Sequence, residues 1–198
     1  FSLMGVPPGS GVRIGIDRDL DGVLDGDEPS SPAVGMPYCF ADGSLATACP
    51  CGNTGISGRG CENSVATGGA RLAAAGTTNP DAVVLSASSE LSSALTIFLQ
   101  GDADAPLGIV FGDGVRCAAG SLKRLGSKNA VNGSTSYPQA GDLSITAKSA
   151  ALGDTIVSGT TRYYQAYYRD PSQTWCASPS GNTWNAGRSH DTSSGKRA

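Results

Sequence analysis

Acidic residues in one short stretch of the chain are spaced as the ligands of a single cation. Residues 17–28 read DRDLDGVLDGDE, in which three aspartates alternate and a glycine follows the third. Alternating carboxylates in a tight turn direct their oxygens at one point, and Ca²⁺ takes about six to eight oxygens. The glycine stands where the chain must turn sharply and a Cβ would obstruct it. The pattern predicts one Ca²⁺ bound by Asp17, Asp19, Asp21, the carbonyl of Val23, Asp25 and Glu28.

The flanks of this loop favour a structural ion over a signalling switch. The strand-like sequence VRIGI precedes the loop, and PSSP follows it almost at once. A single loop without a helix on each side has no groove to open when the ion binds. The alternative interpretation is a solvated acidic linker that binds no ion.

The cysteines form the second set of residues that could carry chemistry. An even number of cysteines in a glycine-rich, lysine-poor chain indicates disulfides and an oxidising compartment. The alternative is a zinc site, but CPC at 49–51 lacks the two-residue spacer of zinc ribbons, and His190 stands in a polar tail. No Cys-x-x-Cys-His sequence for haem attachment is present. The predicted disulfide cysteines are Cys39, Cys49, Cys51, Cys61, Cys117 and Cys176.

The pairing of these cysteines is predicted from their distances along the chain. Cys49 and Cys51 are too close for an easy mutual bridge, so each needs another partner. Six cysteines allow fifteen pairings. Of these we expect Cys39–Cys49, Cys51–Cys61 and Cys117–Cys176.

The sequence does not predict an enzyme. It contains no Gly-x-Ser-x-Gly elbow, no His-Glu-x-x-His motif and no P-loop. Acidic residues outside the predicted calcium loop stand mainly beside glycine or proline, as turn residues do. Asp102 and Asp104, Asp113 in FGDG and the Asn132-Gly133 pair are accordingly predicted as turn residues.

Composition indicates short strands joined by many turns. The chain of 198 residues has 28 glycines and 11 prolines, and it carries a net charge of −3 with no basic cluster. Nucleic acid is therefore not an expected partner, and no apolar run reaches the ~18 residues of a membrane span. We expect an all-β fold of the β-sandwich or jelly-roll type. The predicted organisation is an N-terminal segment 1–28, a proline-rich linker 29–37, a disulfide-stapled region 38–67 and a sandwich 68–198.

Candidate strands recur at short intervals, separated by turn signals. The strongest is TRYYQAYYR, residues 161–169, whose tyrosines fall on both faces of the strand. We favour a central strand with these tyrosines in or beside the core over an exposed aromatic strip that binds a sugar or another strand. A short helix at 88–95 and one edge strand after Cys176 are also possible. The predicted strands are 12–16, 70–75, 82–87, 95–100, 107–111, 121–125, 143–147, 154–157 and 161–169.

Two resemblances add to this interpretation. Residues 17–28 resemble the calcium loops of EF-hands, dockerins and thrombospondin type 3 repeats. CPCGNTGISGRGCENS, GARLAAAG, FGDGVRCAAGSLKRL and YYQAYYRDP together look like an uncharacterised secreted β-sandwich module of planctomycete-type exported proteins. The lead VPPGSGVRIGIDRDLDG also looks like a segment that follows the haem domain of some exported cytochromes. The resemblance implies location and fold and transfers no activity.

The expected function is that of an extracellular, calcium-stabilised, non-catalytic module for structural assembly or surface attachment, within a larger secreted protein or an extracellular polymer. Residues 1–11, with Phe1, Leu3, Met4 and Val6, could add a strand to a second copy or dock on a parent domain. The alternative is a carbohydrate- or cell-wall-binding module attached to a secreted enzyme. Both interpretations place the chain outside the cell or at its surface.

Overall fold

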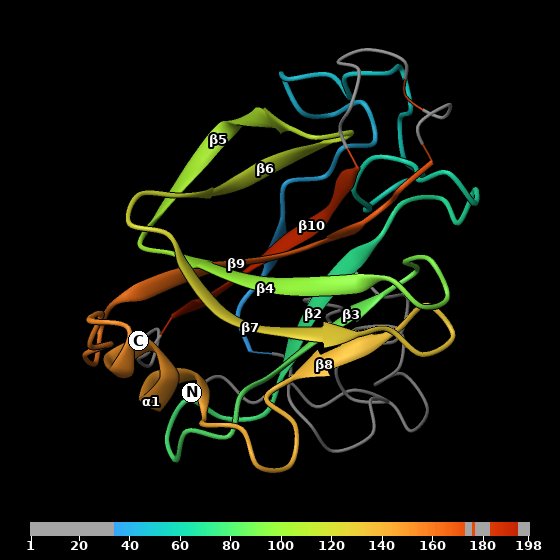
Figure 1. The fold of residues 1–198 in the computed structure, drawn as a ribbon. Helices are drawn as coiled ribbons and strands as arrows, with labels where there is room; N and C mark the ends of the chain where they lie inside the picture. Colours follow the sequence, from blue (N-terminus) through green and yellow to red (C-terminus); the bar gives the residue numbers. More distant parts are fainter. Residues whose placement is uncertain (1–33, 173–175, 177–182, 194–198) are drawn as a thin grey trace, which may run out of the picture.

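The structure, a computed structural model, describes residues 34–172, 176 and 183–193. The predicted calcium loop and the strand predicted at 12–16 lie outside these residues. The described part is built from strands that pair antiparallel, together with one short helix (Figure 1). The elements are β1 (Pro37–Tyr38), β2 (Arg71–Ala75), β3 (Val84–Ser88), β4 (Leu95–Gly101), β5 (Ala103–Phe111), β6 (Gly114–Ala119), β7 (Lys123–Asn129), β8 (Thr135–Tyr137), α1 (Ile145–Ala151), β9 (Thr161–Arg169) and β10 (Trp184–Ser193).

The strands form three sheets. The main sheet has the order β1-β10-β9-β4-β7, a second sheet has the order β2-β3-β8, and β5 and β6 form a hairpin. Figure 1 shows the hairpin and the second sheet on different sides of the main sheet. The predicted all-β fold is confirmed. The described part contains no helix that is both long and apolar enough for a membrane span.

The middle strands of the main sheet are buried on both faces. Successive side chains of a strand point to opposite faces. Phe98 of β4 and Ala166 of β9 therefore pack with Leu72 of the second sheet. Their neighbours Ile97 and Tyr167 pack on the opposite face, toward the hairpin. This explains why β4 and β9 are apolar at consecutive positions, where a strand with one solvated face would alternate.

Two predicted strands are wrong. The strand predicted at 143–147 overlaps α1, because Ser144 caps the helix by accepting a hydrogen bond from the Ala147 N–H and the following residues include good helix formers. The strand predicted at 154–157 has no strand pairing. The helix considered at 88–95 is absent, and Ser89 adopts φ +59° in a turn.

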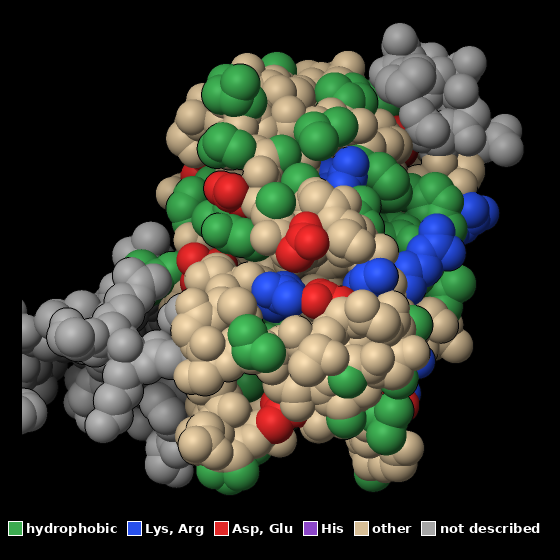
Figure 2. Space-filling view, turned by 90° about the vertical axis from the view of Figure 1, so that its left-hand side faces the viewer, with side chains coloured by type: hydrophobic (Ala, Val, Ile, Leu, Met, Phe, Trp, Pro, Cys, Tyr) green, Lys and Arg blue, Asp and Glu red, His purple; other side chains and the backbone are tan. Residues whose placement is uncertain are grey.

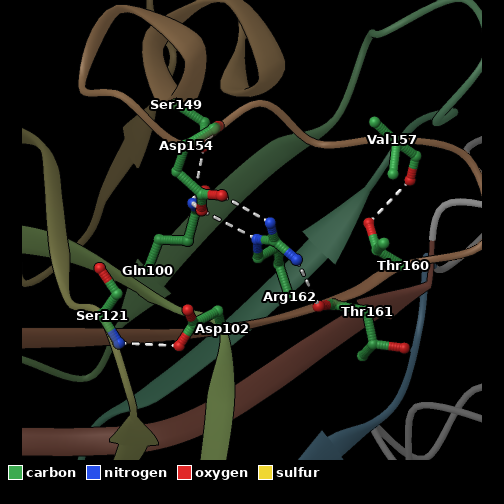
Figure 3. Close-up of polar contacts among 9 residues, drawn as sticks. All are labelled: Gln100, Asp102, Ser121, Ser149, Asp154, Val157, Thr160, Thr161 and Arg162. Carbon is green, nitrogen blue, oxygen red and sulfur yellow. Dashed lines mark hydrogen bonds and ion pairs between the residues drawn. The ribbon is translucent and has the colours of Figure 1, made fainter.

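The segment after α1 is fixed by one carboxylate, which explains why it is irregular (Figure 3). Asp154 accepts two hydrogen bonds from the guanidinium of Arg162, at 2.6 and 2.9 Å. Gln100 of β4 donates to Asp154 at 2.8 Å and to Ser149 of α1 at 2.7 Å. The Arg162 guanidinium lowers the pKa of Asp154. This network joins α1 to the main sheet without strand pairing.

The last strand lies in the sheet interior, which corrects the prediction of an edge strand and a polar tail. β10 lies between β1 and β9, and His190 is 0% exposed. The strand is polar but covered, because the loop before β2 lies against its backbone. Arg188 donates from that strand to the carbonyls of Gly58 and Leu72 at 3.2 and 3.3 Å. A Cβ on Gly60 would collide with the carbonyl of Ala186, so glycine permits the close approach.

All six cysteines form disulfides, as predicted, but each predicted pair is wrong. The bonds are Cys39–Cys117, Cys49–Cys61 and Cys51–Cys176. Pairing by sequence distance assumes that residues 38–64 fold on themselves. They instead pack against β6, where Cys39, Cys49 and Cys61 share a core cluster with Val115 and Cys117.

Candidate functional site

A groove opens between the β5–β6 hairpin and the edge of the main sheet. It has a volume of about 270 Å³, which is close to the lower end of the size range of small-molecule pockets. Its walls come from β4, β5, β6, β7 and β9 and from the β6–β7 turn. We call it the hairpin groove, and it is lined by Leu99, Phe111, Arg116, Leu122, Arg124 and Tyr167.

Three aromatic rings form one side of the groove. Phe111 and Tyr167 line it, and Trp184 packs against Tyr167. The ring centroids of Phe111 and Tyr167 lie 5.1 Å apart, and those of Tyr167 and Trp184 lie 5.2 Å apart, both edge to face. This geometry is favourable for aromatic pairs and holds each ring in place. Burial raises the pKa of Tyr167, so its phenol is neutral at physiological pH. The rings give the groove a rigid apolar wall.

Arginines supply the charge of this face. The guanidinium carbon of Arg124 lies 6.0 Å from the Tyr167 centroid, and that of Arg169 lies 4.9 Å from the Trp184 centroid. Arg116 donates to the carbonyl of Ala118 at 2.7 Å. The ion pairs between described residues are Lys128–Asp142 and Arg162–Asp154. Arg116 and Arg124, which line the groove, and Arg169, which lies over Trp184, thus have no carboxylate partner within the described residues.

The surface view agrees with this distribution. Figure 2 looks onto the side that is on the left in Figure 1, and it shows Lys and Arg side chains in a band, with Asp and Glu side chains among and above them and hydrophobic side chains beside them. The groove is able to hold an anionic group against an apolar wall.

The strand β5 exposes further apolar side chains beside the groove. Leu107, Ile109 and Val110 are 67%, 43% and 48% exposed. The edge of β5 is nevertheless guarded, because the Thr47 N–H donates to the Leu107 carbonyl at 3.0 Å. Pro106 lacks an N–H, and the pairing of β5 with β6 shifts register between Asp104 and Ile109. These features oppose addition of another strand.

The tyrosine strand has the position that the sequence favoured. β9 is central, Tyr164 and Tyr168 are fully buried on one face, and Tyr167 is buried on the other. The exposed strip of four tyrosines is therefore wrong. Of the four tyrosines, Tyr167 lines the hairpin groove. The arginines from β6 and β7 were not recognised from the sequence, because no spacing rule brings positions on different strands together.

The turn predictions are confirmed in part of the chain. Gly112 and Asp113 form the β5–β6 turn, and Asn132-Gly133 forms the β7–β8 turn. Asp102 stands between β4 and β5 and accepts a hydrogen bond from the Ser121 N–H at 2.7 Å. Asp104, predicted as a turn residue, is an exposed residue of β5.

Glu90 is an ionisable residue that the sequence did not single out. Its side chain is 3% exposed, and one oxygen accepts a hydrogen bond from the Thr96 hydroxyl. Its other oxygen has no partner within the described residues. Burial raises the pKa of Glu90 to about 7. A lone carboxyl of this kind does not provide the pair of acids that glycoside hydrolysis needs.

Comparisons with protein-family models, with curated proteins and with solved structures find no match.

Proposed function

We propose that this chain is a non-catalytic extracellular attachment module that binds an anionic polysaccharide in the hairpin groove. The observation that carries this proposal is the gathering of Arg116, Arg124 and Arg169 around rigid aromatic rings, with no carboxylate partner among the described residues. Guanidinium groups bind carboxylate or sulfate in pairs of hydrogen bonds. The aromatic rings of the groove offer an apolar surface for the C–H face of a sugar.

The edge of β5 does not favour polymer formation. Addition of residues 1–11 as a strand at that edge is opposed by Pro106, by the register shift and by Thr47. The disulfides support an oxidising compartment. The calcium loop at 17–28 belongs to the same proposal as a structural ion site, and it lies outside the described residues.

A binding measurement tests the proposed ligand. The purified chain should be retained by a polymer of uronic acid such as polygalacturonate, and retained less by neutral cellulose. The variant Arg116→Gln/Arg124→Gln should weaken the association at least about tenfold, because it removes two charge-assisted contacts. Raised salt should weaken binding by the wild type more than binding by the variant.

The control removes one arginine charge on another sheet, which is half the change of charge in the groove variant. Arg71 of β2 donates to the Ser88 hydroxyl at 3.1 Å and stands on the second sheet. Arg71→Gln should therefore bind like the wild type. Equal retention of the wild type and the groove variant would refute the proposal.

A second candidate function is self-association through the apolar side chains of β5. The exposure of Leu107, Ile109 and Val110 favours it, because exposed apolar patches often mark protein contacts. Sedimentation of the wild type, compared with that of Val110→Lys, would test whether the chain associates with itself. A dimer in the wild type that is lost in the variant would support it.

A further inference from the structure

The carboxylate of Asp113 is buried and lacks a hydrogen-bond partner within the described residues. Asp113 stands in the β5–β6 turn and is 0% exposed, and neither of its side-chain oxygens has a partner among these residues. Nearly all buried polar groups have a partner, so this exception calls for a specific explanation. Burial raises the pKa of Asp113 to about 6, and the group is therefore mainly ionised at neutral pH.

The backbone on each side of this carboxylate is held in place. The Asp113 N–H donates to the carbonyl of Trp184 at 2.8 Å. The Asp113 carbonyl accepts a hydrogen bond from the side-chain amide of Asn53 at 2.9 Å. These bonds tie the β5–β6 turn to β10 and to the loop region that precedes β2, so the turn cannot move outward without breaking them.

A disulfide lies beside the carboxylate. One oxygen of Asp113 lies within 4.8 Å of the sulfurs of Cys51 and Cys176, which are bonded to each other. A disulfide has no hydrogen to donate, whereas each thiol formed by its reduction has an S–H group that is a hydrogen-bond donor. The reduced pair can therefore give Asp113 the hydrogen bond that the oxidised pair cannot.

This disulfide also differs from the other two in exposure. Cys51 is partly exposed, and its partner Cys176 is buried. The four cysteines of the other two bonds are all buried, namely Cys39, Cys49, Cys61 and Cys117. Exposed disulfides have higher reduction potentials than buried structural ones and are the more labile. A thiolate in solution therefore has its best approach at Cys51.

We propose that Cys51–Cys176 is a redox-active disulfide that a dithiol reduces selectively, and that Asp113 stabilises its reduced form. A thiolate of the dithiol attacks the Sγ atom of Cys51, the S–S bond breaks, and the electron pair leaves on Cys176, which takes a proton from water. The second thiolate of the dithiol attacks the mixed disulfide, and Cys51 leaves and is protonated. The dithiol becomes a cyclic disulfide, and the two protons that it loses balance those that the cysteines gain.

Reduction removes one cross-link and leaves the strand pairing in place. Cys51 belongs to the loop region that precedes β2, and Cys176 stands between β9 and β10. The bonds Cys39–Cys117 and Cys49–Cys61 continue to hold the loop region to β6 and to itself. Reduction thus releases the segment before β10 from the loop region within a folded protein.

Graded reduction of the full chain tests the proposal. The folded protein is equilibrated with mixtures of reduced and oxidised dithiothreitol, free thiols are trapped with an alkylating reagent, and peptide mass mapping assigns each bond. Cys51–Cys176 should open at a ratio of reduced to oxidised dithiol at least about tenfold lower than the other two bonds. Opening of all three bonds together, or of another bond first, would overturn the proposal. This order is measured on the wild type and needs no variant.

A substitution separates the role of Asp113 from that of exposure. In Asp113→Asn the bond should need about tenfold more reduced dithiol to open, because the thiol loses a hydrogen bond to a charged group. The oxidised variant should melt no lower than the oxidised wild type, because it no longer buries an uncompensated charge. Asp104→Asn, the same change of charge on an exposed residue of β5, is the matched control and should open like the wild type. Equally easy opening in Asp113→Asn and the wild type would refute the role of Asp113.

Discussion

The two faces of the main sheet differ in the side chains that they carry. The face toward β2, β3 and β8 is a continuous apolar core that includes Leu72, Leu85, Phe98 and Leu125. The face toward the β5–β6 hairpin packs aromatic rings beside arginines, and an uncompensated carboxylate lies under the hairpin turn. Apolar packing on one face supplies stability. The other face carries arginines beside its aromatic rings, which stability alone would not favour.

The largest expected effect is on the apolar face. Phe98→Ala removes a ring that is fully buried between the two sheets and should lower the free energy of unfolding by about 3–5 kcal/mol. Urea unfolding measures this change. Leu122→Ala at the groove rim, where the side chain is 39% exposed, should cost about 0.5 kcal/mol or less. Similar losses in the free energy of unfolding for both substitutions would contradict this difference between the two faces of the main sheet.

Loss of calcium binding by the loop at 17–28 should have the next largest effect, and it should leave the described core folded. Asp17→Ala or Glu28→Gln removes a predicted ligand of the loop and should sharply weaken calcium binding there. At a hundredfold excess over the dissociation constant, the ion stabilises its binding site by about 2.7 kcal/mol. Calorimetry checks the affinity, and near-ultraviolet circular dichroism checks that the sandwich remains folded. If millimolar calcium does not bind to the intact chain, residues 17–28 are an acidic linker.

Two carboxyl groups should make stability depend on pH, because burial raises the pKa of Glu90 on the apolar side to about 7 and that of Asp113 in the β5–β6 turn to about 6. The folded-state pKa of Glu90 is raised to about 7 from 4.5, so the protonated form is favoured in the fold. Its contribution is complete below the unfolded pKa and is lost as the pH rises through about 7. The Glu90 contribution should fall between pH 5 and pH 8 by on the order of 2 kcal/mol, and Glu90→Gln should remove that part of the slope. An unchanged slope in Glu90→Gln would assign the whole effect to other groups such as Asp113.

The smallest effect on stability should come from the groove arginines. Arg116→Gln/Arg124→Gln should change the free energy of unfolding by about 0.5 kcal/mol or less, because these side chains have no described ion pair. Thermal unfolding measures this change, and polysaccharide retention is measured on the same samples. Loss of binding at constant stability would sharpen the contrast between the two faces. A large loss of stability would show that the arginines belong to the core packing.

The strands that the sequence predicted best are those with dense apolar content. β9 was predicted with its observed bounds, and β4 within one residue, because β4 carries consecutive large apolar side chains and β9 carries two pairs of tyrosines. β10 was misjudged because its polar residues are satisfied by contacts with loops far away in the sequence. The hairpin groove depends on five strands, and local sequence does not specify which positions on separate strands meet. The cysteine partners could not be predicted for the same reason.

The position of β10 affects how the chain matures. This late strand lies between the first strand described and β9, and Cys51 pairs with Cys176, which is 125 residues later. Contacts of such long range slow folding, because the intervening chain must be in place first. Cys51 therefore stays without its partner until nearly all of the described chain has been synthesised. A chain that stops before β10 would leave β9 with an unpaired edge and would also lack the strand that β1 pairs with.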